Sequence, residues 1–563
     1  MPTVEVNRED FEALLGFGLP KDPEELNDIL AYVKGETKYF DEQEIHIEIK
    51  DSNRADLWSV EGLVRALKGF LNFEKGLKNY DAAGSSGVEI WVDARLKDIR
   101  PFIACAIIKN VELNDIAIRQ IMHLQDKMDQ TYGRQRKRTS IGLYNFDLVN
   151  PPLRYGVAKP EEISFVPLEF EEKLTLREIL QKHPKGVEYG HIVQSHPFWP
   201  IFMDSEDRVL SFPPIINSND LGRVTEDTRN VLIEVTGTVY KTVLNTLTNV
   251  TLALADRGGK IHSVKVHYPY ENMKEAITPE LKGEILDIDV EYIWKVIGMK
   301  LNPSELKDFL ERARYGVIKT TRSKITVEIP CYRVDVMHPI DVVEDIAIAH
   351  NYNRMQPRWP QLLTIGGVSS ETKFSELVRE VMVGLGFQEI LSFSLSNPET
   401  LFIRMNLKPE RVVEIANPKV SSMVCLRSWL LPSLMEFLSR NIHVEYPQKI
   451  FEVGYCVVHE EKEENKTRDI EKLACVTMHS NASFTEAKSM LEAFLMNLGL
   501  RYELEEMVHG SFIEGRTGRI NIGKEEVGFI GEIHPQVLQN WNLENPAAAF
   551  EINLNKLKDF FND

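Results

Sequence analysis

The sequence has 563 residues, of which 43% are hydrophobic and 27% charged, and its formal net charge is −19. At roughly 100–200 residues per domain, this length predicts several globular domains with ordinary cores. The acidity argues against a protein that coats nucleic acid over most of its surface, because phosphate contacts require basic side chains. Any contact with RNA must therefore be local, or shared with a more basic partner.

The cysteines and the lengths of the apolar segments indicate in which cellular compartment the protein is located. No pair of the five cysteines has CxxC spacing, which argues against a zinc site and favours free thiols in a reducing compartment. Residues 1–16 lack the pattern of a signal peptide. No apolar run approaches the roughly 18 residues that a membrane helix needs. We expect a cytoplasmic protein that has no contact with a membrane.

The first segment, residues 1–85, alternates strand and helix patterns. Ile45, Ile47 and Ile49 alternate with polar residues, which predicts a half-buried strand. Ser59 is expected to begin a helix in which Glu61 and Arg65 pair at i,i+4. The stretch YDAAGSSGVE, at 80–89, predicts a linker.

The rest of the chain predicts three further domains. Residues 88–275 combine strands with helices at 114–133 and 240–257, the second of which ends at Gly258 and Gly259. Residues 276–355 predict two helices followed by a strand, with a helix start at Asn302. Residues 360–563 begin with a helix and continue with strands punctuated by glycine. The whole is an α+β multidomain protein.

A cluster of carboxylates closes the third domain. Asp341, Glu344 and Asp345 are spaced i, i+3 and i+4, which places them on one face of a helix that begins near Pro339. Asp335 lies six residues upstream of Asp341. Oxygen ligands of this kind suit magnesium. The same acidic residues could instead stabilise the N-terminus of the helix, or face basic side chains at an interface.

Two further features of residues 88–275 bear on function. Glu234, Thr236 and Thr238 alternate on one strand, and that face could floor a pocket or be exposed to solvent. Pro213 and Pro214 would form a rigid wall near it.

The second feature is a basic run in an otherwise acidic chain, which could be a solvated loop or a patch that contacts RNA phosphates. Its members are Arg134, Arg136, Lys137 and Arg138.

The string P-x-Y-R-x-D-V-x-H-P-x-D-V-V-E-D-I-A, at 330–347, resembles the signature of the winged-helix-like domain in phenylalanyl-tRNA synthetase beta subunits of the archaeal and eukaryotic-cytosolic type. The likeness extends over nearly the whole chain, including NRADLWSVEGLVRAL at 53–67, where Ala55 replaces the usual proline. It implies magnesium (Mg²⁺) bound at Asp335, Asp341, Glu344 and Asp345.

The string SFPPIINS, at 211–218, followed by the acidic-x-T-G-T strand, resembles the tRNA-editing domain of the same family. That domain hydrolyses tyrosine misattached to phenylalanine tRNA. The resemblance implies that Glu234 accepts the tyrosine hydroxyl, while Ser211, Asn217 and Thr236 shape the pocket. Many relatives carry Asp at the position of Glu234, and Asp where Val239 stands here.

The C-terminal segment resembles a class II synthetase core, an antiparallel-sheet domain that is expected to be catalytically inert here. It lacks the arginine of an F/Y-R-x-E turn that grips the ATP α-phosphate, and it lacks the second arginine after a Gly-rich strand. Arg427, Arg516 and Arg519 stand in other contexts and are expected to serve packing or interfaces.

The resemblance therefore implies that a separate alpha subunit binds ATP and activates phenylalanine, in an assembly of two alpha and two beta chains that charges tRNA(Phe). No additional C-terminal anticodon-binding domain is expected. Two other interpretations stay open at this point. One is a non-catalytic RNA-binding or scaffold paralogue, and the other is a free-standing hydrolase of mischarged tRNA.

Overall fold

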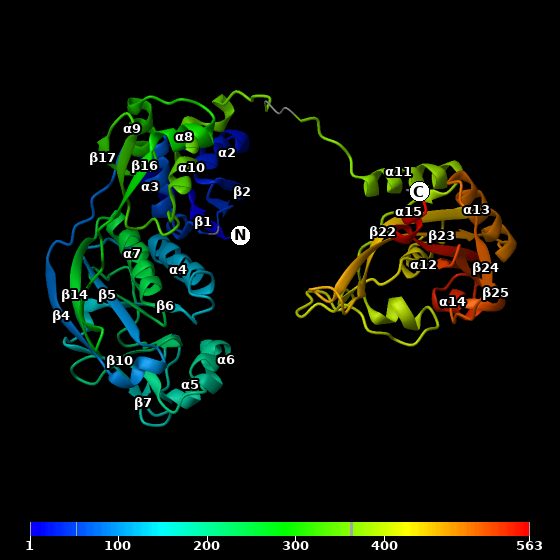
Figure 1. The fold of residues 1–563 in the computed structure, drawn as a ribbon. Helices are drawn as coiled ribbons and strands as arrows, with labels where there is room; N and C mark the ends of the chain where they lie inside the picture. Colours follow the sequence, from blue (N-terminus) through cyan, green and yellow to red (C-terminus); the bar gives the residue numbers. More distant parts are fainter. Residues whose placement is uncertain (1, 52, 361–363, 562–563) are drawn as a thin grey trace. The chain divides into compact units, whose positions relative to one another are not determined.

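The computed structural model describes residues 2–51, 53–360 and 364–561, and the chain divides into two compact units, Met1–Arg358 and Trp359–Asp563 (Figure 1). The finer boundaries expected inside the first unit stay a prediction. Within the described ranges, no helix is both long and apolar enough to span a membrane. All five cysteines are free, as expected.

The first unit begins with a three-stranded sheet of order β1-β3-β2, covered by short helices. Ile45, Ile47 and Ile49 are fully buried, which confirms the predicted strand. The Ser59 hydroxyl accepts a hydrogen bond from the Gly62 amide (3.0 Å), so the predicted helix start is also confirmed. The elements are β1 (Thr3–Asn7), α1 (Arg8–Leu15), α2 (Pro23–Leu30), β2 (Gly35–Phe40), β3 (Glu44–Ile49) and α3 (Val60–Phe70).

The expected pair between Glu61 and Arg65 does not form. Both side chains point instead to the end of a distant helix, α7 (Tyr240–Asp256). Arg65 binds Asp256 at 2.6 Å, and Glu61 binds Arg257. Both residues are almost fully buried, so contacts with a partner far away in sequence outweigh the local i,i+4 geometry.

A ten-stranded mixed sheet forms the centre of the first unit. β4 pairs in parallel with β7 and β14, and the other pairs are antiparallel. The expected linker at 80–89 is wrong in its second half, because β4 already begins at Ser85. In sheet order the strands are β12 (Ile216–Asn217), β11 (Val209–Phe212), β10 (Trp199–Met203), β7 (Leu153–Ala158), β4 (Ser85–Val92), β14 (Lys260–Tyr270), β5 (Phe102–Lys109), β13 (Val231–Gly237) and β6 (Thr139–Asn145), with β15 (Met273–Thr278) beside β14.

Helices α4 (Asp115–Gln130) and α7 pack against this sheet and share an aliphatic core with β5, β13 and β6 (Figure 1). A second core lies on the opposite side of the same strands. The small helices α5 (Leu176–Lys182) and α6 (Pro184–Tyr189) and the strand pair β8 (Ser164–Phe165) and β9 (Leu174–Thr175) are inserted between β7 and β10.

The first unit ends with a sheet of order β16-β18-β17 and three helices around one core. Asn302 caps its helix through a capping box with Glu305, as the sequence predicts. The elements are β16 (Glu284–Asp289), α8 (Val290–Ile297), α9 (Pro303–Arg312), β17 (Gly316–Thr320), β18 (Lys324–Ile329) and α10 (Pro339–His350).

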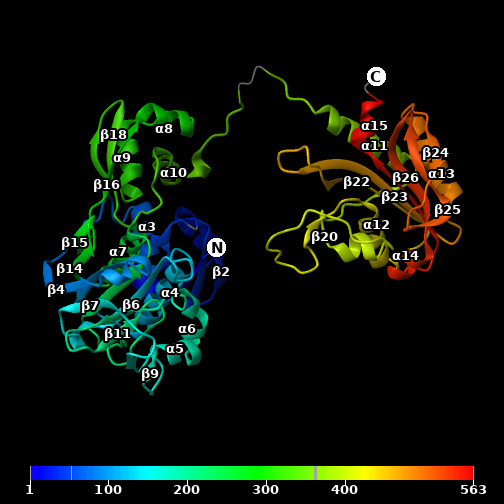
Figure 2. The ribbon, with the colours of Figure 1, turned by 60° about the horizontal axis from the view of Figure 1, so that its bottom comes forward.

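The second unit is a seven-stranded, mainly antiparallel sheet of order β19-β22-β23-β27-β26-β25-β24. Helices α12 and α14 share a core with one face, and α11, α13 and α15 share a core with the other (Figure 2). The elements are α11 (Ser370–Gly384), β19 (Gln388–Glu389), β20 (Leu395–Ser396), β21 (Cys425–Leu426), α12 (Leu431–Arg440), β22 (Gln448–His459), β23 (Thr467–Met478), α13 (Phe484–Asn497), β24 (Glu503–Glu506), β25 (Phe512–Ile522), β26 (Glu525–Ile533), α14 (Pro535–Asn540), β27 (Ala547–Asn553) and α15 (Leu554–Asp559).

The buried ion pairs of Arg257 should be essential to the first unit. Arg257 binds Asp10 at 2.8 Å and also binds Glu61. Arg257→Met would leave the buried Glu61 and the largely enclosed Asp10 without a cation, so the free energy of unfolding should fall by about 3–5 kcal/mol. Hydrogen exchange of the first unit in increasing urea would measure the loss.

The matched control is Arg119→Met. Arg119 pairs with Asp115 in an exposed i,i+4 bridge, and an exposed pair contributes only about 0–1 kcal/mol. Equal losses in the two variants would contradict the role given to the buried network.

Candidate functional site

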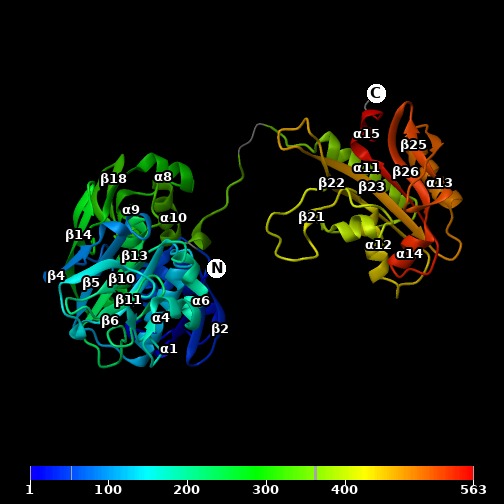
Figure 3. The same cartoon turned by 90° about the horizontal axis from the view of Figure 1, so that it is seen from below.

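A cavity of about 270 Å³ lies in the first unit beside the large sheet. Its wall combines residues of α4 and α6, which lie near each other in Figure 3, with the loop after β11. Of the predicted pocket residues, Ser211, Asn217 and Glu234 line this cavity, and Thr236 does not. The structure thus brings together three residues that the sequence separates by up to 23 positions.

The strand that carries Glu234 is fully enclosed. β13 pairs with β5 on one side and β6 on the other, and each of its residues is buried. The alternative of a solvent-exposed strand face is therefore wrong. Thr238 lies beyond the end of β13 and is exposed, so it does not share the buried face with Glu234 and Thr236.

Glu234 is 2% exposed and is placed in an unusual environment for a carboxyl group. The Tyr144 hydroxyl donates to its Oε2 at 2.7 Å, whereas its buried Oε1 has no hydrogen-bond partner among the described residues. Burial raises the pKa of Glu234 to about 7, although the Tyr144 hydrogen bond, the charge of Arg100 and the nearby Thr236 hydroxyl all act to lower it. A buried acceptor without a partner is costly, and a ligand hydroxyl would relieve that cost.

Thr236 belongs to a second layer of contacts behind the cavity. The guanidinium of Arg100, which is 1% exposed, donates to the Thr236 hydroxyl at 2.8 Å and to the Thr236 carbonyl oxygen at 2.7 Å. It also donates to the Ser140 hydroxyl and to the Arg136 carbonyl oxygen, each at 3.0 Å. Arg100 thereby ties β13, β6 and the basic run together. Its sequence context, DIRPF, carries no motif that could have identified it.

The basic run does not form one surface patch. Arg136 is 8% exposed and lines the cavity. It donates to the carbonyl oxygens of Pro214 (3.2 Å) and Ile215 (2.9 Å), and its guanidinium lies over the Tyr189 ring. The expectation of a phosphate contact is thus corrected for Arg136, which fixes the Pro-Pro wall.

The other members of the basic run remain near the surface. Arg134 and Lys137 are exposed and Arg138 is half-buried. Contact of these three side chains with tRNA stays a prediction.

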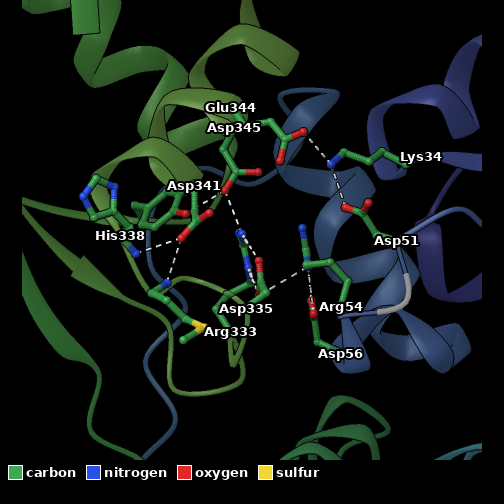
Figure 4. A network of polar contacts seen from close by, with 12 residues as sticks. Lys34, Asp51, Arg54, Asp56, Arg333, Asp335, His338, Asp341, Glu344 and Asp345 are labelled. Carbon is green, nitrogen blue, oxygen red and sulfur yellow. Dashed lines mark hydrogen bonds and ion pairs between the residues drawn. The ribbon is translucent and has the colours of Figure 1, made fainter. Parts of the chain in front are cut away.

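The predicted magnesium carboxylates are occupied by protein groups (Figure 4). Asp341 accepts hydrogen bonds from the backbone amides of Met337 (2.9 Å) and His338 (2.8 Å), so it caps α10. Glu344 accepts from the Lys34 ammonium at 2.8 Å. These contacts match the two alternatives to a metal, which are helix capping and pairing with basic side chains.

Arg333 holds the other two carboxylates of the cluster. Its guanidinium contacts Asp335 at 2.7 Å and Asp345 at 2.8 Å, and the Tyr315 hydroxyl donates to Asp345 at 2.6 Å. Burial opposes ionisation of Asp335, but Arg333 and Arg54 lower its pKa below the ordinary value.

In the part of the chain that the structure describes, no three His, Cys, Asp or Glu side chains are placed to hold one metal ion. As arranged, the four carboxylates therefore do not fit a shared magnesium ion. The magnesium site stays a prediction from the resemblance, and no step of the function below passes through it.

The three arginines of the second unit singled out from the sequence each pair with a carboxylate. Arg427 is buried and contacts Glu452 at 2.8 Å. Arg516 contacts Glu532 at 2.7 Å, and Arg519 contacts Glu526 at 3.0 Å. The contact of the buried Arg427 agrees with the packing role expected from the sequence, whereas Arg516 and Arg519 form their ion pairs at the surface, and their roles stay a prediction.

Each of the two units contains a segment that matches the model of a known protein family. Residues 286–352 match the tRNA synthetase B5 domain, and residues 355–554 match the phenylalanyl tRNA synthetase beta chain CLM domain. The phenylalanine–tRNA ligase beta subunit of Pyrococcus furiosus is 44% identical over 99% of this chain and 100% of its own length. That of Methanocaldococcus jannaschii is 40% identical over 98% and 100%.

A solved structure also resembles the chain. The N-terminal fragment of the phenylalanyl-tRNA synthetase beta subunit from Pyrococcus horikoshii is 41% identical, with a TM-score of 0.60. The match covers 62% of this chain and all of that fragment.

The titration of Glu234 should be measurable. Because its folded-state pKa is raised from 4.5 to about 7, this group favours the folded state at low pH, and that contribution is lost as pH rises through about 7. As the pH is raised from about 5 to about 8, the melting temperature of the wild type should therefore decrease relative to that of Glu234→Gln.

Difference infrared spectroscopy of the same pair provides a direct check. The band of a protonated carboxyl should disappear near pH 7 in the wild type and be absent from Glu234→Gln. A carboxylate already ionised at pH 5 would contradict the assignment.

Proposed function

This chain belongs to the family of phenylalanine–tRNA ligase beta subunits, and from that premise we propose that it works with an alpha subunit to attach phenylalanine to tRNA(Phe) using ATP. We place the assembly in the cytoplasm, as two alpha and two beta chains. The premise rests on identity above 40% to ligase beta subunits along almost the entire chain.

The proposal assigns amino-acid activation to the alpha subunit. Gripping the phosphates of ATP needs guanidinium groups that are free to bind them. In the second unit, the candidate arginines are instead neutralised by Glu452, Glu532 and Glu526. This arrangement supports a structural role for the second unit.

The proposal assigns to the cavity the hydrolysis of tyrosine misattached to tRNA(Phe). Tyrosine differs from phenylalanine by one hydroxyl, and an apolar pocket rejects such a ligand by only about 100-fold. A second site that requires the hydroxyl can remove the errors. The observation that carries this proposal is the buried Glu234, whose Oε1 has no partner among the described residues.

The chemistry of Glu234 suits selection of a phenol. When ionised, Oε1 can accept the tyrosine hydroxyl, while a phenylalanine ring would leave the same oxygen buried and unsatisfied. His183 also lines the cavity, but its Nδ1 accepts from the Lys185 amide and its Nε2 faces the Leu168 carbonyl oxygen. We therefore assign selection and positioning of the ester to the cavity, without a histidine base.

The alternative interpretations differ in what they require of a partner. A scaffold paralogue would bind RNA without hydrolysis, and a free-standing hydrolase would act without an alpha subunit. Neither is favoured by a specific contact in the structure. Contact of tRNA with Arg134, Lys137 and Arg138 is a further part of the proposal that rests on the family resemblance. Magnesium at the carboxylate cluster rests on the same resemblance and would require the carboxylates to leave their present partners.

Editing should depend on Glu234. Tyrosyl-tRNA(Phe) incubated with the assembled enzyme should be deacylated, and Glu234→Ala should slow that reaction by about tenfold or more, as expected for loss of a hydrogen bond to a charged group. The control is Glu271→Ala, which removes an exposed carboxylate in the β14–β15 turn and should have no effect. Equal deacylation rates for Glu234→Ala and the wild type would reject the role of Glu234.

Aminoacylation should require both chains. This chain alone, supplied with phenylalanine, ATP and tRNA(Phe), should form no product, and addition of the alpha subunit should restore charging. Isolation as a stable monomer that never associates with a catalytic subunit would refute the ligase assignment.

A further inference from the structure

We propose that Tyr144 is a positioning residue for selection of tyrosine: it fixes the Glu234 carboxyl so that Oε1 alone meets the substrate hydroxyl. This inference rests on the proposed editing function. Tyr144 is fully buried and is not among the residues that line the cavity. Its effect on a ligand must therefore pass through Glu234.

The sheet places Tyr144 behind the carboxyl group. Gly142 on β6 lies directly opposite Glu234 on β13, and Tyr144 follows two residues later on the same strand face. The Tyr144 ring packs edge-on to Phe202, with ring centroids 6.1 Å apart. Its hydroxyl lies 2.7 Å from Glu234 Oε2 and 3.4 Å from Asn217 Oδ1. It thus contacts two of the predicted pocket residues from outside the cavity.

Gly142 provides the space for this contact. A Cβ atom at this position would lie 2.3 Å from the Tyr144 hydroxyl and 2.6 Å from Glu234 Oε2. Both distances are far below van der Waals contact, so any residue other than glycine must displace the hydrogen-bonded pair. Glycine at 142 is needed here to keep Tyr144 and Glu234 together.

The hydrogen bond also sets which oxygen faces the substrate. A phenol has one proton to donate, and Tyr144 directs it to Oε2. Oε2 is then an acceptor whether Glu234 is ionised or neutral, and a proton gained on titration goes to Oε1. The ionised form therefore presents Oε1 as an acceptor, which a tyrosine hydroxyl can satisfy and a phenylalanine ring cannot.

Tyr144→Phe tests the inference in the assembled enzyme. The variant keeps the ring and removes only the hydroxyl. Because the lost hydrogen bond favours the charged form of Glu234, deacylation of tyrosyl-tRNA(Phe) at neutral pH should slow by about tenfold. The pH midpoint of the reaction should also rise, an effect that a merely structural role would not produce.

Tyr268→Phe is the matched control. Tyr268 is buried in the same core, but its hydroxyl donates to the Ile103 carbonyl oxygen and does not contact Glu234. This variant should keep the wild-type pH midpoint. Charging of tRNA(Phe) with phenylalanine, measured for every variant, reports whether the assembly is intact.

Two further variants perturb the same hydrogen-bonded pair from other positions. Gly142→Ala should reproduce the raised midpoint and the slower deacylation, because its methyl group displaces the pair. In a Glu234→Gln background, Tyr144→Phe should cause little further loss, as expected for residues that act as a unit.

The possible failures are distinguishable. Absence of deacylation by the wild-type assembly would overturn the editing proposal itself. Deacylation that depends on Glu234 but keeps its rate and pH midpoint in Tyr144→Phe would overturn only the role of Tyr144.

Discussion

The pairing of β13 with both β5 and β6 is the constraint on which the candidate site depends. It places every residue of β13 inside the first unit, so a carboxyl group on this strand cannot be solvated by bulk water. The cost of that burial raises the pKa of Glu234 to about 7. The same pairing brings Gly142 opposite Glu234, and it sets the distance at which Tyr144 can reach the carboxyl group. The selectivity proposed for this site would thus be a consequence of sheet register.

Buried arginines organise the rest of the molecule. Arg257 links the N-terminal segment to α7, Arg333 joins two carboxylates beside α10, and Arg427 binds Glu452 within the second unit. Arg100 differs from these three, because it is buried against hydroxyl and carbonyl oxygens. Guanidinium groups suit such positions because their planar donors can satisfy several acceptors at once. Several cations of this acidic chain are therefore structural and unavailable to nucleic acid.

The sequence predicted local structure better than it predicted long-range contacts. The strand of Ile45, Ile47 and Ile49 and the helix starts at Ser59 and Asn302 depend on neighbouring residues, and all are confirmed. The predicted pair of Glu61 with Arg65 failed because each side chain finds a partner almost 200 residues away.

At the candidate site, the residues that stand in sequence motifs are predictable, and those brought there only by the fold are not. Ser211, Asn217 and Glu234 were found because they stand in motifs. No motif marks Arg100 and Tyr144, because only the tertiary arrangement of a ten-stranded sheet brings them behind the cavity, against Thr236 and Glu234. The basic run predicts that Arg136 lies at the surface because charge runs are usually solvated, and no feature of its neighbours indicates that it is buried.

The two departures from the family pattern near the site have different physical consequences. Val239 is the N-cap residue of α7, makes no side-chain capping bond, and is not part of the cavity wall. An aspartate there would be a favourable cap, so its replacement bears on the start of a helix and not on ligand selection. Glu234 is different, because its extra methylene extends the carboxyl group across the space left open by Gly142 to the Tyr144 hydroxyl. The residue that departs from the pattern inside the cavity is thus accommodated by Gly142 and held by Tyr144.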